Sequence, residues 1–116
     1  MEVTEIRQKL KNQTLTAMSN AIAEYLKTQP VLKAWIFGSF ARGEDTPWSD
    51  IDILVEYDRK QTVGLMKIAG IKNNLEDILD RNVDLVESGT LRPYAVESVN
   101  HDKKLIYERT SSPLQY

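Results

Sequence analysis

The first segment of the chain carries apolar residues at helical spacing. Between residues 3 and 27 they recur at multiples of about four positions, which is typical of an amphipathic helix with one buried face. The positions are Ile6, Leu10, Met18, Ile22 and Leu26. The polar residues Asn12 to Thr14 are a candidate break in this helix. Pro30 follows the end of the pattern and cannot continue a helix.

Three shorter segments have the β-branched and aromatic content of strands. They are "VLKAWIF" at 31–37, "DIDILVEY" at 50–57 and "NVDLVE" at 82–87. Residues 63–80 have one apolar helical face, although Gly70 weakens that helix. A short helix is predicted after Pro93, through Val99, and "KKLIYE" at 103–108 is a fourth strand or extended segment. Strands separated by helices predict an α/β (α+β) fold, a small mixed sheet with flanking helices.

The size and composition of the chain predict one domain. With 116 residues, 41% hydrophobic and 28% charged, it is long enough for a core and too short for two domains. We expect a single domain over residues 1–116, with the polar end "TSSPLQY", residues 110–116, as a loose tail. This one domain must therefore hold the whole activity or share it with a partner.

Composition and charge also exclude several classes of function. There is no apolar run of about 18 residues and no signal-like N-terminus, so we expect no membrane span and a cytoplasmic protein. Zero cysteines exclude disulfides, thiolate chemistry and cysteine-based zinc sites. The net charge of -2 gives no broad basic surface, so direct binding to nucleic acid is not expected.

Two carboxylates open the strand predicted at 50–57. Because side chains alternate along a strand, Asp50 and Asp52 share one face, about 6 to 7 Å apart, while Ile51 and Ile53 occupy the other. An isolated Asp-x-Asp is most often a solvated strand end or a helix cap. The surrounding residues must therefore decide whether this pair has a chemical role.

A third acid supports a chemical role. Asp84 lies between Val83 and Leu85, so a single carboxylate again projects from a strand that otherwise forms core. If the two strands are neighbours, the carboxylates of Asp50, Asp52 and Asp84 converge. Like charges this close repel and raise one another's pKa, so such a patch is costly unless a hard cation neutralises it. Oxygen-only ligands favour magnesium or manganese over zinc.

The loop before the acids resembles a phosphate site. Gly38 lets the backbone approach a ligand, and Ser39 offers an N–H and a hydroxyl at the predicted start of a helical turn. The loop is neither the dinucleotide fingerprint nor the Walker loop. Arg42 fits two roles equally well, binding a phosphate oxygen or locking the loop through backbone carbonyls.

Other polar and aromatic residues have ordinary explanations. Trp48 is expected to pack at the turn, with base stacking as the less favoured alternative. His101 lies in a polar turn and is expected to be solvated, and Ser39 has no visible base partner as a nucleophile. The remaining acids are expected to be plain surface charges: Glu44, Asp45, Glu56, Asp58 and those of "NNLEDILDR".

The stretch "GSFARGEDTPWSDID" resembles the signature of the DNA polymerase beta nucleotidyltransferase superfamily, Gly-Ser, ten residues, Asp-x-Asp. The length of the chain and the "SDIDILV" strand are similar to the minimal nucleotidyltransferases (MNT), antitoxins encoded beside HEPN ribonuclease toxins. The resemblance implies a polymerase-beta-like fold. It implies that Asp50, Asp52 and Asp84 hold two Mg2+ ions and are catalytic, and that Gly38 and Ser39 bind the triphosphate.

The expected function follows from this resemblance. Minimal nucleotidyltransferases transfer AMP from ATP to a tyrosine of the partner HEPN toxin, so we expect a magnesium-dependent protein adenylyltransferase that acts as an antitoxin. Two alternatives stay open, a non-catalytic antitoxin that neutralises by binding and a regulatory nucleotide-binding module. Metal-dependent transfer of label from ATP to a partner would separate the enzyme from both.

Overall fold

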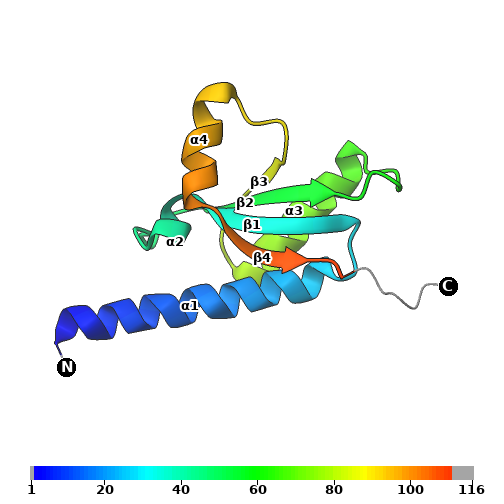
Figure 1. Ribbon diagram of the computed structural model, residues 1–116. Coiled ribbons are helices and arrows are strands. Elements are labelled where there is room, and N and C mark those ends of the chain that lie inside the picture. Colours follow the sequence, from blue (N-terminus) through cyan, green and yellow to red (C-terminus); the bar gives the residue numbers. More distant parts are fainter. Residues whose placement is uncertain (1, 111–116) are drawn as a thin grey trace.

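The computed structural model describes residues 2–110, which form four helices and four strands (Figure 1). The elements are α1 (Val3–Leu26), β1 (Val31–Phe37), α2 (Gly38–Arg42), β2 (Ile51–Tyr57), α3 (Leu65–Leu79), β3 (Val83–Glu87), α4 (Pro93–Asp102) and β4 (Lys104–Glu108). Apart from Thr110, the predicted tail lies outside the described residues. None of the described helices has the length and apolar character needed to cross a membrane.

The strands form one mixed sheet in the order β3-β2-β1-β4. β1 pairs antiparallel with both β2 and β4, whereas β2 and β3 are parallel. A parallel pair needs a crossover connection, and α3 supplies it. The predicted fold class, a small mixed sheet with flanking helices, is confirmed.

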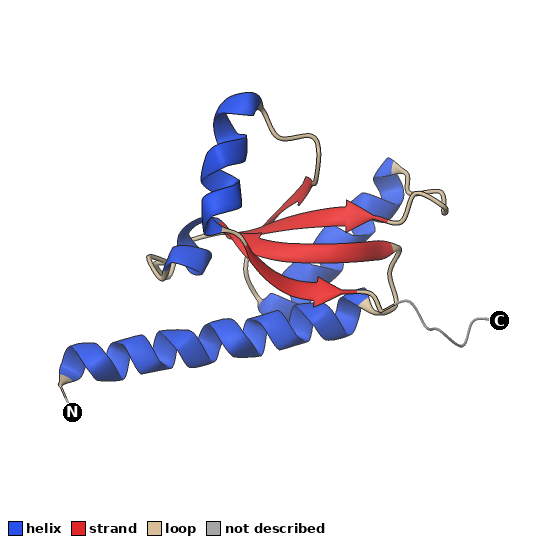
Figure 2. Ribbon diagram, viewed as in Figure 1, coloured by secondary structure: helices blue, strands red, loops and turns tan. Residues whose placement is uncertain are grey.

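The core lies on one face of the sheet. Ile51, Ile53 and Val55 alternate along β2 and are fully buried, in one cluster with Ile22 of α1 and Leu75 of α3. Figure 2 shows α3 passing behind the strands and α1 running below them. Because side chains alternate along a strand, Asp52 and Leu54 point to the opposite face of the sheet.

The first helix differs from the prediction in two ways. α1 is continuous through Asn12–Thr14, where the Thr14 hydroxyl donates to the Leu10 carbonyl at 3.0 Å. Ile6 and Leu10 are exposed, at 43% and 57%, rather than part of the buried face. At about 100° per residue, steps of four residues rotate the stripe by about 40°, so from Ile6 to Ile22 it turns by about 160°. Only the second half of α1 therefore packs on the sheet, and the first half projects beyond it (Figure 1).

Asp58, which follows β2, is buried instead of being a surface charge. Its Oδ1 accepts from the Lys60 backbone N–H at 3.0 Å, and its Oδ2 accepts from Arg109 Nη1 at 2.8 Å. These two interactions, the backbone N–H first, lower the pKa of the carboxyl below its ordinary value. Arg109 also donates to the Gln29 carbonyl at 2.9 Å. Asp58 lies just after the end of β2. Through Arg109 it links the residues after β4 to the turn between α1 and β1.

We expect Asp58→Asn to lower the melting temperature near pH 7. Because its folded-state pKa is lowered, the carboxylate stabilises the fold above the unfolded pKa of about 4, and this contribution is lost as the pH falls through the folded pKa. The difference in melting temperature between wild type and variant should therefore narrow toward pH 3. Asp77→Asn, a change at an exposed carboxylate of α3, is the control. An equal difference at both pH values would contradict the linkage.

Candidate active site

The structure places two of the three predicted acids side by side. Asp52 of β2 and Asp84 of β3 are partners in the parallel register, so their side chains leave the sheet on the same face from strands about 4.8 Å apart. This is the face opposite the isoleucine core of β2. Asp50 was expected to be the first residue of this strand, but β2 begins at Ile51, so Asp50 lies just before the strand and is exposed. The prediction that Asp52 and Asp84 lie on adjacent strands is correct.

The acids act on one another electrostatically. Burial, followed by the negative charges of Asp84 and then Asp50, raises the pKa of Asp52 to about 6. Arg42 opposes this rise. An ionised Asp52 therefore sits in a site that disfavours its charge, and a bound cation would remove that penalty.

The carboxylates form an open donor set. Within residues 2–110, no three His, Cys, Asp or Glu side chains already close around a metal position. Magnesium does not require such a cage, because it keeps several of its waters and is usually held by one or two carboxylates together with substrate phosphates. The register pair Asp52 and Asp84, with Asp50 two residues before Asp52, fits a hard cation of this kind.

The predicted phosphate turn begins directly beside Asp52. Phe37, the last residue of β1, is the register partner of Asp52, and α2 starts at the next residue. Gly38 has a φ of +73°, and a Cβ at this position would collide with the Asp52 carboxylate, lying 3.1 Å from its Cγ. Only glycine fits both the backbone angle and the contact. Ser39 is the second residue of α2, as the helical turn predicted at this serine requires.

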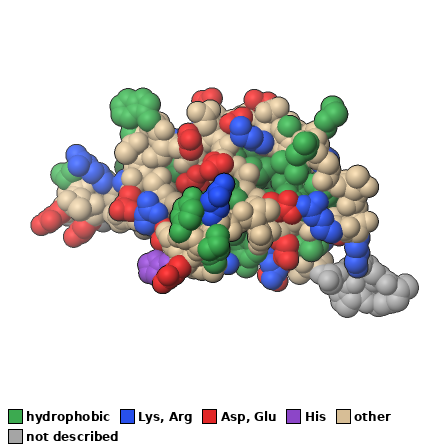
Figure 3. Space-filling model, turned by 90° about the horizontal axis from the view of Figure 1, so that it is seen from above, with side chains coloured by type: hydrophobic (Ala, Val, Ile, Leu, Met, Phe, Trp, Pro, Cys, Tyr) green, Lys and Arg blue, Asp and Glu red, His purple; other side chains and the backbone are tan. Residues whose placement is uncertain are grey.

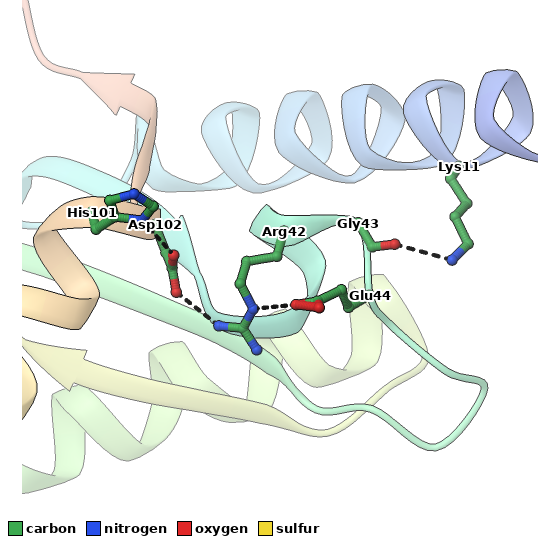
Figure 4. Close-up of polar contacts among 6 residues, drawn as sticks. All are labelled: Lys11, Arg42, Gly43, Glu44, His101 and Asp102. Carbon is green, nitrogen blue, oxygen red and sulfur yellow. Dashed lines mark hydrogen bonds and ion pairs between the residues drawn. The ribbon is translucent and has the colours of Figure 1, made fainter.

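Arg42 makes contacts that the sequence did not suggest. Its Nε donates to Glu44 Oε1 at 2.5 Å, and its Nη1 donates to Asp102 Oδ2 at 2.7 Å (Figure 4). Of the two roles left open for Arg42, locking the loop is met by pairs with two carboxylates and not by bonds to backbone carbonyls, and the exposed Glu44 is one of these carboxylates. No local pattern identifies Asp102, because it lies 60 residues along the chain at the end of α4.

The turn before β2 also differs from expectation. Trp48 is 87% exposed, so its predicted packing role is wrong. The turn is held instead by the Ser49 hydroxyl, which accepts from the Thr46 N–H at 2.8 Å, and by Arg81, which donates to the carbonyls of Thr46 and Ser49 at 3.1 Å. His101 is exposed, with 88% of its side chain accessible, as predicted.

Seen from above, red acidic side chains gather near the middle of the surface, and green hydrophobic side chains lie both beside them and at the edges of the molecule (Figure 3). The exposed large hydrophobic residues are Val3, Ile6, Leu10, Trp48, Leu65, Met66, Ile78, Tyr94, Val96 and Leu105. They come from different elements, and among them Trp48 lines a pocket together with Asp50.

Comparison with known proteins places this geometry in context. The family described as "Nucleotidyltransferase domain" matches residues 19–106. The inferred protein adenylyltransferase MJ0126 of Methanocaldococcus jannaschii is 42% identical over 73 residues, which are 62% of this chain and 70% of that protein. Over these 73 residues the chain is therefore similar to a protein named as an inferred adenylyltransferase.

Solved structures share the fold. The structure of an inferred minimal nucleotidyltransferase is 33% identical, with a TM-score of 0.67 over 79% of this chain and 92% of that one. The tri-AMPylated HEPN toxin of Shewanella oneidensis in complex with its MNT antitoxin has a TM-score of 0.61 at 22% identity, over 82% of this chain and 73% of that one. The second likeness is one of fold alone.

We expect Gly38→Ala to disturb the site far more than Gly89→Ala. Both glycines have positive φ, +73° and +92°, so both substitutions strain the backbone, by about 1 kcal/mol. Only at Gly38 does the new methyl group meet another side chain, that of Asp52, whereas nothing lies within 4 Å at Gly89. Thermal melts and ATP titrations of both variants compare the two effects. Equal losses of ATP binding would mean that the contact with Asp52 has no role.

We expect Asp52→Asn to stabilise the metal-free protein near pH 7. Because the pKa of Asp52 is raised, its charge opposes folding above pH 6, and this cost fades as the pH falls through 6 toward the ordinary value of 3.8. The gain should be about 1 kcal/mol, less than the roughly 3 kcal/mol of the full shift, because the side chain is only partly buried.

Thermal melts with and without MgCl2 measure this effect. Magnesium should raise the melting temperature of the wild type more than that of Asp52→Asn, and the advantage of the variant should be small near pH 4. A metal-free variant that is less stable than wild type at pH 7 would contradict the charge repulsion.

Proposed function

This chain belongs to the nucleotidyltransferase domain family, and from that premise we propose that it transfers AMP from ATP to a tyrosine of a partner HEPN toxin. In this proposal it is a magnesium-dependent protein adenylyltransferase that acts as the antitoxin of its partner. The observation that carries the proposal is the register pair Asp52 and Asp84 next to the glycine turn at Gly38.

The residues have distinct roles in the proposed reaction. Asp50, Asp52 and Asp84 would hold two Mg2+ ions, which would activate the acceptor oxygen and neutralise the departing pyrophosphate. Gly38 and Ser39 would bind the triphosphate at the start of α2, and Arg42 would support them from the last residue of the same helix.

Asp84 is proposed to assist the acceptor. A tyrosine hydroxyl has a pKa near 10 and is protonated at neutral pH, so its attack on the α-phosphorus needs a carboxylate that accepts the proton. Asp84 is exposed and lies beside Asp52, where an incoming hydroxyl group could reach it. As the new bond to the α-phosphorus forms, the bond to pyrophosphate breaks.

The acceptor is proposed to come from a second protein. The described elements supply a sheet, its covering helices and the acidic site. One chain of the Shewanella complex shares the fold of this protein, and that complex pairs an MNT antitoxin with an AMPylated HEPN toxin. A partner of this class would present its tyrosine to the exposed side of Asp84. The cytoplasmic location stays a prediction.

We expect AMP transfer to the partner to depend on both magnesium and the acids. This protein is co-expressed with the product of the neighbouring gene, and the resulting complex is incubated with ATP labelled in its α-phosphate. Asp52→Asn and Asp84→Asn should each reduce labelling by at least about a hundredfold, and a chelator should abolish it. Asp84→Asn should retain more nucleotide binding than Asp52→Asn, because its role lies with the acceptor.

Asp77→Asn, on the far side of the fold in α3, is the matched control and should label like wild type. Ser39→Ala should weaken ATP binding by about tenfold, from the loss of one hydrogen bond to a charged group. Labelling that survives in Asp52→Asn, or that ignores the chelator, would show that the acids do not catalyse the transfer. A partner that is bound but never labelled would favour a non-catalytic antitoxin. Nucleotide binding without any transfer would favour a regulatory module.

A further inference from the structure

Arg42 is the one charged residue of α2, and it lies on the side of this helix that faces away from the core. Phe40 and Ala41 are buried and fix the inner side of this five-residue helix. Arg42 follows Ser39 by three residues and Gly38 by four, so all three lie on one side of the helical turn. The position of Arg42 is therefore tied to the position of the predicted phosphate turn.

Two carboxylates hold the guanidinium in a fixed direction. Glu44 pairs with Nε from the residues that follow α2, and Asp102 pairs with Nη1 from the end of α4, while Nη2 takes no part in either pair. The side chain of Asp102 is only 11% exposed, against 44% for Arg42. A carboxylate so shielded from water is a stronger anchor than an ordinary surface ion pair.

The topology explains why these distant residues meet. β4 begins at Lys104, directly after α4, and pairs with β1 so that Lys104 lies opposite Ile36. The start of β4 is therefore at the same end of the sheet as the end of β1, where α2 begins. Asp102 joins the two connections at this end, and Figure 4 shows its carboxylate pointing at the guanidinium of Arg42.

A second contact supports the same turn from the other side. Lys11 of α1 donates to the carbonyl of Gly43, the residue after α2, at 3.1 Å. Lys11 is exposed, and it contacts the residue that ends the turn, not the guanidinium of Arg42. Among the contacts of residues 2–110, the pair with Asp102 is thus the one that links Arg42 to another element of the fold.

We propose that Asp102 is a positioning residue for nucleotide binding, which acts by holding Arg42 and thereby keeping α2 seated beside Asp52. This inference rests on the proposed nucleotidyltransferase function. Without the anchor, α2 can roll on Phe40 and Ala41, and Gly38 and Ser39 lose their position beside Asp52. The acids themselves stay in place, because they belong to β2 and β3. Nucleotide affinity should therefore fall while the chemical step at saturating ATP is kept.

The experiment measures ATP binding in the presence of MgCl2 by calorimetry for a set of variants. Asp102→Asn and Arg42→Gln should each weaken binding by about tenfold, the loss expected for one charged hydrogen bond. If Asp102 acts through Arg42, the double variant should bind no more weakly than Arg42→Gln alone. Asp102→Glu, which keeps the charge, should recover most of the affinity. Glu97→Gln, which removes an exposed carboxylate of α4, is the matched control and should bind like wild type.

Transfer kinetics and melting temperatures complete the test. In Asp102→Asn the KM for ATP should rise about tenfold, with kcat within about threefold of wild type. Wild-type affinity in Asp102→Asn would overturn the inference. So would losses that multiply in the double variant, or a fall in kcat together with a large fall in melting temperature. Wild-type protein that binds ATP but transfers nothing would reject the proposed function instead, and the binding comparison would still decide the role of Asp102.

Discussion

The parallel pairing of β2 with β3 is the constraint on which the site depends. It sets Asp52 and Asp84 side by side on one face while the isoleucines of β2 enter the core on the other. A shift of one residue in this register would send the carboxylates into the core and the isoleucines into water. The apolar face therefore fixes the position of the acids, and the fold cannot relieve their repulsion by sliding the strands.

The glycine turn depends on the same pair of strands. Because Phe37 lies opposite Asp52, the chain must leave β1 next to a carboxylate, and the first residue of α2 has no room for a side chain. The close approach of backbone to carboxylate brings a helix start, which attracts anions, against a cluster that attracts cations. A nucleotide with its metal carries both kinds of charge, and each would lie beside the group that attracts it.

Features that depend on local spacing could be predicted from the sequence, and features that depend on tertiary contacts could not. The acids and Gly38 follow from strand alternation and from a motif contained in fifteen residues. Asp102 could not be found in this way, because its partner Arg42 is 60 residues distant and only the β1–β4 pairing brings them together. Trp48 was predicted to pack from its residue type alone, but the hydrogen bonds of its own turn leave it in water.

The first half of α1 projects beyond the sheet, so the two halves of this helix differ in stability. A helix of 24 residues is about 36 Å long, whereas strands of seven residues extend about 23 Å, so α1 is longer than the sheet beneath its second half. Ile22 is fully buried, so we expect the amides around it to exchange with solvent only when the whole domain unfolds. Those before Leu15 have a single exposed helix to protect them, and short helices in water are marginal. One continuous helix thus contains a segment that opens locally and a segment that opens only with the fold.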